Sequence, residues 1–391
     1  MNYKISHRAA SLAPSLTLII DSKAKAMKAA GEDVVGFGAG EPDFDTPQHI
    51  KDAAAKALAD GFTKYTPSSG IPEFREAIAA KFKNENGLVY KPSQCIVSCG
   101  GKHSCFNAIL ATCQEGDEVL IPAPYWLSYP EMAKLAGAKP VILPTSDRTE
   151  FKVMPEQLRK AITPNTRMFI FNSPSNPTGT VYTPEETKAL GDICVERGVL
   201  IMSDDIYEHL IYDGAKVKSV ASFSQAHYDH TIIVHGLAKA WSMTGWRLGF
   251  LAAPEPIAKA VDAIQSHSTS NPTSFAQKGG VAALTGPQDH LKTWLAEFDK
   301  RRRYAHAKLS ATPGLSCVNA KGAFYLFPNI SKTGLKSADF CEKLLEQEKV
   351  AAVPGIAFGA DDYIRISYAT SMENIEKGLD RIEKFCRSLV N

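Results

Sequence analysis

The chain has 391 residues, of which 44% are hydrophobic and 22% charged, an ordinary composition for a globular protein of two or three domains. Its 44 Lys and Arg residues nearly balance 42 Asp and Glu residues, so the net charge of +2 gives no basic surplus of the kind that favours nucleic-acid binding. No apolar run reaches the roughly 18 residues that a membrane-spanning helix needs.

The N-terminal stretch "LAPSLTLII" (residues 12–20) has the apolar character of a signal peptide. Pro14 and Ser15 interrupt it, however, and it continues directly into "DSKAKAMKAAG". We therefore expect a helix that is capped by Ser15 and ends at Gly31, and no secretion signal.

Seven short apolar runs, most of them rich in β-branched residues, follow between residues 95 and 253. They read "CIVSC", "EVLIP", "PVILP", "RMFIF", "VLIMSD", "TIIVH" and "LGFLAA", and amphipathic stretches such as "TPEETKALGDICVERG" separate most of them. Strands that alternate with helices indicate an α/β fold, with a mostly parallel sheet covered on both faces. We expect a large domain over residues 37–286.

The pattern changes after Pro287. A long polar helix, "DHLKTWLAEFDKRRRYAHAKL", comes first, and strands ("GAFYLFPNI", "YIRISYAT") are then mixed with helices ("SADFCEKLLEQE", "SMENIEKGLDRIEKFCRSL"). This mixture predicts a smaller α+β domain, formed by residues 287–391 together with residues 1–36.

Unusual loops follow five of the seven predicted strands: "GGK", "PAPYW", "NSPSNPTG", "SDDIY" and "HGLAK". In open α/β sheets, ligands bind outside the carboxyl ends of the strands. We therefore expect the five loops to converge on one site, which favours an enzyme.

Lys239 follows the strand "TIIVH" among the small residues Gly236, Ala238 and Ala240. It is either a surface lysine on the first turn after a strand or a desolvated amine that forms a Schiff base with a carbonyl group. In the same way, Asp204 either caps a loop or pairs with the ring nitrogen of a pyridine cofactor.

The other candidate residues leave similar alternatives open. Tyr207 and Trp126 suit either the core or contact with a cofactor ring, and Asn176 either a turn or a hydrogen bond to that ring. Gly100 and Gly101 form either a plain strand-to-helix turn or a phosphate site. Arg247 and Arg365 are surface cations by default, but Arg365 lies within the apolar strand "YIRISYA", where its guanidinium requires a carboxylate partner.

Eight cysteines occur, and four of them, Cys95, Cys99, Cys105 and Cys113, lie close together in the sequence. Their spacing lacks the C-x-x-C pairs of zinc sites, so we expect reduced thiols, no metal and a cytoplasmic protein.

Taken together, these motifs resemble the class I pyridoxal-phosphate-dependent aminotransferases of fold type I, and especially the bacterial-type aspartate aminotransferases. The stretches that carry the resemblance stand in that family's order: "GAGEPDFDTP", "TKYTPSSGIPEFREAIA", "PAPYWLSYPEM", "NSPSNPTG", "SDDIYEHL", "KAWSMTGWRLG", "GAFYLF" and "IRISYATS". The resemblance covers residue 11 to the end of the chain.

The resemblance implies a homodimer with a seven-stranded sheet, transferring an amino group from L-aspartate to 2-oxoglutarate. It implies that Lys239 holds pyridoxal 5'-phosphate and moves a proton, that Asp204 pairs with the ring nitrogen, and that Tyr207 and Asn176 hold the ring oxygen. Further implied contacts are stacking by Trp126, phosphate binding by Gly101, Lys102 and Arg247, phosphate binding in the neighbouring subunit by Tyr65, and binding of the substrate α-carboxylate by Arg365 with Gly40, Trp126 and Asn176.

Two residues depart from the family pattern. Gly236 stands where many members have a serine that binds the phosphate, and Ala13 stands where many have a lysine that binds the distal carboxylate of aspartate. Aromatic or prephenate transamination and β-lyase activity are therefore alternatives within the family. A nicotinamide-dependent dehydrogenase is disfavoured because "GFGAGEP" has the wrong glycine spacing and no helix after it, and a non-catalytic cofactor binder because Arg365 is kept.

Overall fold

Seven strands pair edge to edge into one sheet in the order β2-β8-β7-β6-β5-β3-β4, in a computed structural model that describes residues 3–12 and 16–390. Strand β8 runs antiparallel to β2 and β7, and the other pairs are parallel. The strands are β2 (Cys95–Ser98), β3 (Glu118–Ala123), β4 (Lys139–Pro144), β5 (Thr166–Asn172), β6 (Leu200–Asp204), β7 (Thr231–Gly236) and β8 (Gly249–Ala252). Each coincides with one of the seven predicted runs, so the predicted mostly parallel seven-stranded sheet is confirmed.

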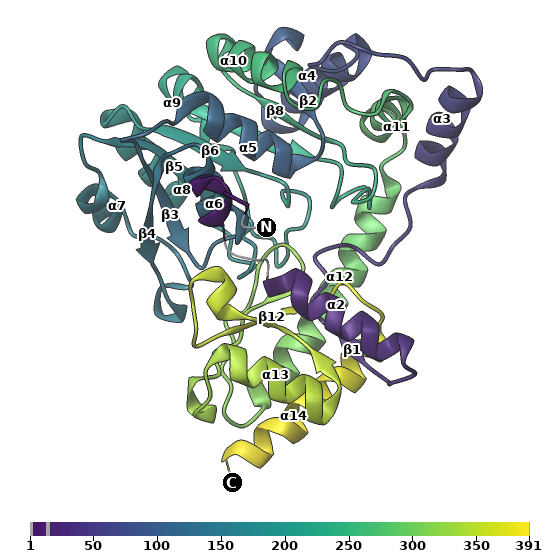
Figure 1. The fold of residues 1–391 in the computed structure, drawn as a ribbon, viewed down its shortest axis with the longest axis vertical. Coiled ribbons are helices and arrows are strands. Elements are labelled where there is room, and N and C mark those ends of the chain that lie inside the picture. Colours follow the sequence, from purple (N-terminus) through teal and green to yellow (C-terminus); the bar gives the residue numbers. More distant parts are fainter. Residues whose placement is uncertain (1–2, 13–15, 391) are drawn as a thin grey trace.

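Helices cover both faces of this sheet, in the upper part of Figure 1. Because side chains alternate along a strand, Ile170 and Met202 pack on one face and Phe169 and Ile201 on the other. The first face is covered by α5 (Gly101–Thr112), α6 (Ser128–Leu135) and α10 (Glu255–Ser266). The second is covered by α3 (Gln48–Ala59), α4 (Pro72–Asn86), α7 (Pro155–Ala161), α8 (Pro184–Glu196) and α11 (Ser274–Thr285), with α9 (Gln225–His230) against α8.

A smaller group of elements lies below the sheet in Figure 1. Its strands β9 (Tyr325–Leu326), β11 (Val353–Pro354) and β12 (Ile364–Ser367) form an antiparallel sheet, which is shorter than the predicted runs "GAFYLFPNI" and "YIRISYAT". Its helices are α12 (Asp289–Ala311), α13 (Ser337–Glu348) and α14 (Met372–Val390). Together they enclose a core around Phe298, Phe340 and Phe385.

The N-terminal segment packs against this lower part. Strand β1 (Val35–Gly36) pairs in parallel with β10 (Val350–Ala351), and α2 (Leu16–Ala29) contacts β10 and β11. A short helix α1 (His7–Ala10) was not predicted. The predicted cap Ser15 lies outside the described residues, whereas Gly31 follows the end of α2 with a φ of 86°. The division at residues 36 and 287 stays a prediction.

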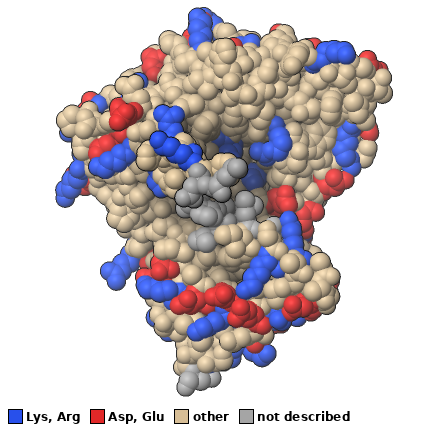
Figure 2. All heavy atoms as spheres, in the orientation of Figure 1, with Lys and Arg blue, Asp and Glu red and all other residues tan. Residues whose placement is uncertain are grey.

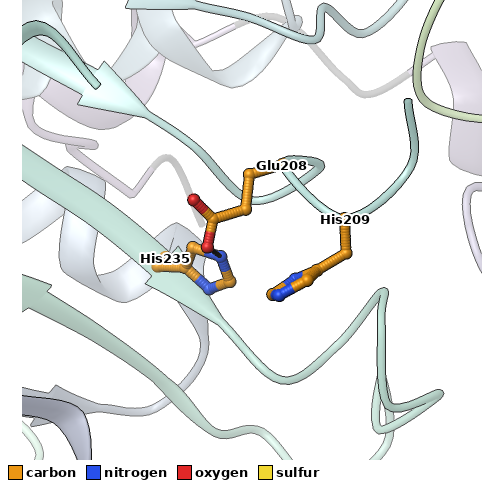
Figure 3. A group of neighbouring side chains, drawn as sticks. All are labelled: Glu208, His209 and His235. Atoms are coloured by element: carbon orange, nitrogen blue, oxygen red, sulfur yellow. Dashed lines mark ion pairs between the residues drawn. The ribbon is translucent and has the colours of Figure 1, made fainter. Parts of the chain in front are cut away.

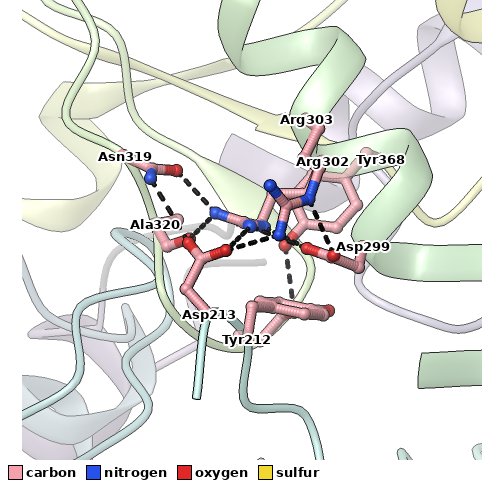
Figure 4. A network of polar contacts seen from close by, with 9 residues as sticks. Tyr212, Asp213, Asp299, Arg302, Arg303, Asn319, Ala320 and Tyr368 are labelled. Carbon is pink, nitrogen blue, oxygen red and sulfur yellow. Dashed lines mark hydrogen bonds and ion pairs between the residues drawn. The ribbon is translucent and has the colours of Figure 1, made fainter. Parts of the chain in front are cut away.

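A buried charge network joins α12 to two loops (Figure 4). The Arg302 side chain, which is 1% exposed, donates to Asp299 on its own helix at 2.6 Å and to Asp213, in the segment after β6, at 2.8 Å. It also donates to Asn319 Oδ1 at 2.6 Å and to the Ala320 carbonyl at 2.9 Å. Because a buried guanidinium requires partners on all sides, this network fixes the lower part against the loop that follows β6.

One face of the molecule is hollowed between the two parts, with Lys and Arg side chains around the hollow (Figure 2). Within the described ranges 3–12 and 16–390, none of the helices has the length and apolar character needed to cross a bilayer.

Candidate active site

A pocket of about 330 Å³ lies between the carboxyl ends of the central strands and the lower part of the molecule. Its volume falls within the range of about 300–1,000 Å³ typical of small-molecule sites. Ten predicted site residues line it: Gly40, Gly101, Lys102, Trp126, Asn176, Asp204, Tyr207, Lys239, Arg247 and Arg365; Tyr65 and Gly100 do not. The structure therefore brings together loops that lie more than 300 residues apart in the chain.

Lys239 follows β7 and directs its side chain into this pocket, where Nζ donates a hydrogen bond to the Gly40 carbonyl. Burial lowers the pKa of Lys239 to about 8, and the nearby Arg365 charge acts in the same direction. The rings of Tyr207 and Phe324 each lie 5.8 Å from Nζ. A lysine in these surroundings carries a neutral amine far more often than a surface lysine does, as a nucleophile or base requires.

Asp204 ends strand β6 and is 6% exposed. Burial raises the pKa of its carboxyl group, while the hydrogen bond from Tyr129 opposes that shift. The Tyr129 hydroxyl donates to Oδ2 at 2.7 Å, and the backbone N–H of Ile206 donates to Oδ1 at 3.3 Å. Two hydrogen bonds thus fix the Asp204 carboxyl group on the pocket wall.

Two neighbouring segments position the polar groups beside Asp204. The Asn172 amide, at the end of β5, donates to the Asp204 carbonyl at 2.9 Å and accepts from the Asn176 N–H at 3.0 Å. On the other side the Tyr207 and Tyr325 hydroxyls are 2.8 Å apart, and burial raises the pKa of Tyr207 well above its usual value. Both phenols therefore stay protonated at neutral pH and can donate hydrogen bonds.

Arg365, on β12, is 3% exposed and has an unsatisfied donor. Its guanidinium donates to the Asn176 Oδ1 at 3.0 Å and to the Gly38 carbonyl at 2.7 Å, and its Cζ lies 4.6 Å from the Tyr325 ring centre. Within the described part of the chain, its Nε has no hydrogen-bond partner. Because an unpaired buried charge is costly, this guanidinium fits a pocket that receives a carboxylate.

An anion cradle lies at the N-terminus of α5. Gly100 caps this helix with a φ of 93°, and a Cβ there would lie 2.6 Å from Arg247 Nη2. Only glycine therefore allows the guanidinium to lie so close to the helix end. Burial, and then the charge of Arg247, lower the pKa of Lys102. Among the described residues neither cation has a carboxylate within ion-pair distance, so helix dipole and both charges remain available to an anion such as phosphate.

The remaining predicted residues lie as follows. Trp126 packs edge-on against Tyr129 with ring centres 5.2 Å apart, and Lys102 Nζ lies 5.1 Å from the indole ring. Tyr65 is 90% exposed and lies outside the pocket of its own chain. A Cβ at Gly236 would lie 3.0 Å from Gly249 Cα, so the strand pairing leaves little space for a serine there. Ala13 lies outside the described residues.

Several pocket residues were not predicted. Tyr129, Asn172 and Tyr325 stand inside the motifs "PAPYWLSYPEM", "NSPSNPTG" and "GAFYLF", but the sequence alone did not single them out. Glu41, whose carboxylate accepts from the Thr244 hydroxyl at 2.7 Å, was not predicted either. Tyr129 and Tyr325 could not be distinguished in the sequence from aromatic residues that simply pack in the core.

Glu208, His209 and His235 form a separate cluster outside the pocket lining (Figure 3). Each has one possible metal-ligand atom within 4.8 Å of those of the other two. However, the Lys81 ammonium already contacts Glu208, and Asn86 donates to the same carboxylate at 2.9 Å. Although burial opposes it, the Lys81 charge and His235, 2.9 Å away, hold the pKa of Glu208 well below its usual value. A buried ion-pair network therefore explains the cluster without a metal.

Comparison with known proteins gives one consistent result. The model of the family "Aminotransferase class I and II" matches residues 32–382. An aspartate aminotransferase of Geobacillus stearothermophilus is 51% identical, with 98% of each chain covered, and an aspartate/prephenate aminotransferase of Cereibacter sphaeroides is 48% identical, with 98% of this chain and 99% of the relative covered. The crystal structure of the aspartate aminotransferase from Rhizobium meliloti superposes with a TM-score of 0.95 at 41% identity, covering 99% of this chain and 100% of that one.

Proposed function

The chain belongs to the class I and II aminotransferases, and from this premise we propose that it transfers the amino group of L-aspartate to 2-oxoglutarate, giving oxaloacetate and L-glutamate. The observation that carries the proposal is the pocket itself. It holds a lysine with a pKa of about 8, a buried carboxylate and a guanidinium with an unsatisfied donor. Two relatives that are 51% and 50% identical to this chain, over 98% of its length, are named aspartate aminotransferases.

We propose that the pocket binds pyridoxal 5'-phosphate, because its donor groups fit each part of that molecule. The cradle of Gly101, Lys102 and Arg247 suits the phosphate, and Trp126 offers a flat face to the ring. Asp204 suits the ring nitrogen, while Tyr207 and Asn176 suit the ring oxygen. When bound, the cofactor supplies a protonated pyridine ring that accepts electrons as bonds at the substrate Cα break.

The residues of the chain divide the remaining work. Lys239 would hold the cofactor through its neutral amine, and its Nζ, once free, would carry the proton between the substrate Cα and the C4′ carbon of the cofactor. Asp204 keeps the ring nitrogen protonated. Arg365 binds the substrate α-carboxylate through the Nη hydrogens that Asn176 and Gly38 leave available, next to Gly40, Trp126 and Asn176.

The names of the relatives point to aspartate as the substrate, and prephenate or aromatic amino acids are the second candidates. The specific observation behind the second candidates is the relative from Cereibacter sphaeroides, whose name includes both activities. Ala13 adds to it, since it offers no charge to a distal carboxylate.

We propose further that two chains form a homodimer in which Tyr65 serves the site of the neighbouring chain. A tyrosine that is 90% exposed and outside its own pocket suits this role. We also propose two domains, residues 37–286 and residues 1–36 with 287–391, and a cytoplasmic location, in keeping with eight cysteines that are all free thiols.

The test is to assay the purified protein with 2-oxoglutarate and one amino donor at a time. Oxaloacetate production from aspartate, dependent on pyridoxal phosphate, is the expected result. If aspartate gives no product while phenylalanine reacts rapidly, the aspartate assignment is wrong. If no donor reacts, the proposed activity itself is wrong.

A further inference from the structure

The Asp204 carboxyl group is contacted by two side chains that have no role in the reaction proposed above. Its Oδ2 accepts a hydrogen bond from the Tyr129 hydroxyl at 2.7 Å, and the Cys105 thiol lies 3.7 Å from the same oxygen. Tyr129 belongs to α6 and Cys105 to α5, so two helices on one face of the sheet contact one carboxylate oxygen. Tyr129 is 2% exposed and Cys105 is fully buried, so bulk water does not compete for these contacts.

The surroundings of Tyr129 favour a hydroxyl that donates its hydrogen bond to Asp204 Oδ2. Burial and then the negative charge of Asp204 raise the pKa of Tyr129 well above its usual value, so the hydroxyl stays protonated throughout the neutral range. Its ring packs edge-on against Trp126, which limits its rotation. The Cys105 thiol is a weaker donor at a longer distance, and burial raises its pKa as well.

We propose that Tyr129 is a positioning residue whose hydroxyl keeps the Asp204 carboxylate ionised and oriented, so that the proton shared with the cofactor stays on the ring nitrogen. This inference rests on the proposed function. The proton in question lies between the Asp204 carboxylate and the ring nitrogen of the cofactor. The presence of Asp204 alone does not determine which of the two groups carries it.

The sign of the effect follows from the surroundings of Asp204. Burial alone favours the neutral carboxylic acid, because a buried anion lacks the solvation that water gives. A donor hydrogen bond to the ionised form opposes this and makes the carboxylate less basic. Tyr129, the Ile206 N–H, Cys105 and the Lys239 charge all lower the pKa of Asp204, whereas the neighbouring buried carboxyl group of Asp205 is a like charge that repels it. Without the Tyr129 hydroxyl, the shared proton moves towards Asp204 and the ring nitrogen becomes neutral.

A neutral ring nitrogen is a poor electron acceptor, so the loss of one hydroxyl group would slow proton removal at the substrate Cα. The cofactor would remain bound, because the change removes only a hydroxyl that bonds to Asp204 and leaves the residues proposed for the phosphate and the ring oxygen in place. This combination distinguishes a positioning residue from one that merely stabilises the fold.

The variant Tyr129→Phe tests the proposal, since it removes only the hydroxyl. Tyr125→Phe is the matched control, because Tyr125 lies in the segment that leads into α6 and is not among the hydrogen-bond partners that the described residues offer to the Asp204 side chain. The first measurement is a pH titration of the Asp204 carboxyl carbon by ¹³C NMR in the cofactor-free protein, with the signal assigned through Asp204→Asn. We expect the midpoint to rise by about one to two pH units in Tyr129→Phe and to stay unchanged in Tyr125→Phe.

The second measurement is the ¹⁵N chemical shift of cofactor labelled at the ring nitrogen and bound to each protein. The expected result is a protonated nitrogen in the parent protein and in Tyr125→Phe, and a shift towards the neutral form in Tyr129→Phe. An unchanged midpoint and an unchanged ¹⁵N shift in Tyr129→Phe would reduce Tyr129 to a packing residue. Failure of the parent protein to bind pyridoxal phosphate would instead overturn the proposed function, a result that the titration of the cofactor-free protein does not depend on.

Discussion

Replacement of Arg365 by lysine tests how the pocket binds its substrate. The Arg365 guanidinium already donates to Asn176 at 3.0 Å and to the Gly38 carbonyl at 2.7 Å, and its remaining Nη hydrogens are left for a ligand. A lysine ammonium is a point charge with three donors, and it cannot keep both protein contacts and also bind a carboxylate in two-pronged geometry. One charged hydrogen bond to the substrate is therefore lost, which costs about 1.5–3 kcal/mol, or about ten- to 150-fold in kcat/KM.

The assay is steady-state kinetics with aspartate and with phenylalanine as donors. Because the α-carboxylate is common to every amino acid, KM should rise and kcat/KM should fall by a similar factor for both. Arg301→Lys is the control, since Arg301 is also buried and paired, with Asp43 at 2.7 Å, but lies outside the pocket. A defect confined to aspartate would place Arg365 at the side-chain end of the substrate and refute the reasoning.

Three further predictions concern the other site residues. With a pKa of about 8 set by burial, Lys239 is neutral above that pH, so the reaction of the cofactor-free protein with pyridoxal phosphate should accelerate as pH rises through 8; a midpoint near the ordinary lysine value of about 10.4 would contradict the buried geometry. Asp204→Asn is nearly isosteric, so turnover should fall by about two orders of magnitude while the melting temperature of the cofactor-bound protein changes little; parent-like turnover would remove Asp204 from the mechanism. Mixing Lys239→Ala with Tyr65→Phe subunits should restore activity above that of Lys239→Ala alone, because one site of each hybrid carries neither change; activity that only averages the parents, despite subunit exchange, would mean that Tyr65 serves its own chain.

The fold was largely predictable because its strands are short, apolar and separated by helices with clear signals. Runs such as "TIIVH" and "RMFIF" became β7 and β5 with ends within one or two residues of the prediction. The lower part was harder to delimit. "GAFYLFPNI" yields only Tyr325–Leu326 as a strand, since the flanking residues bond to loops and bridges rather than to a continuous ladder.

The site was predictable where a polar residue stood in an improbable place, as Arg365 does inside an apolar strand. It was not predictable where the functional group looks like core. Tyr129 is an aromatic residue in a helix that packs on a sheet, and only the 2.7 Å contact with Asp204 distinguishes it from its neighbours. The partners of Arg365 were hidden for a different reason, because Gly38 lies 327 residues away in the sequence.

The central claim is that this pocket carries out half of a transamination with cofactor held on Lys239. The most direct measurement is the visible absorbance of the purified protein, saturated with pyridoxal phosphate, while aspartate is added without any oxo acid. We predict that the band of the protein-bound cofactor disappears, that one oxaloacetate forms per site, and that 2-oxoglutarate restores the band. An unchanged band, or borohydride reduction that fixes the cofactor on a lysine other than Lys239, would contradict the account.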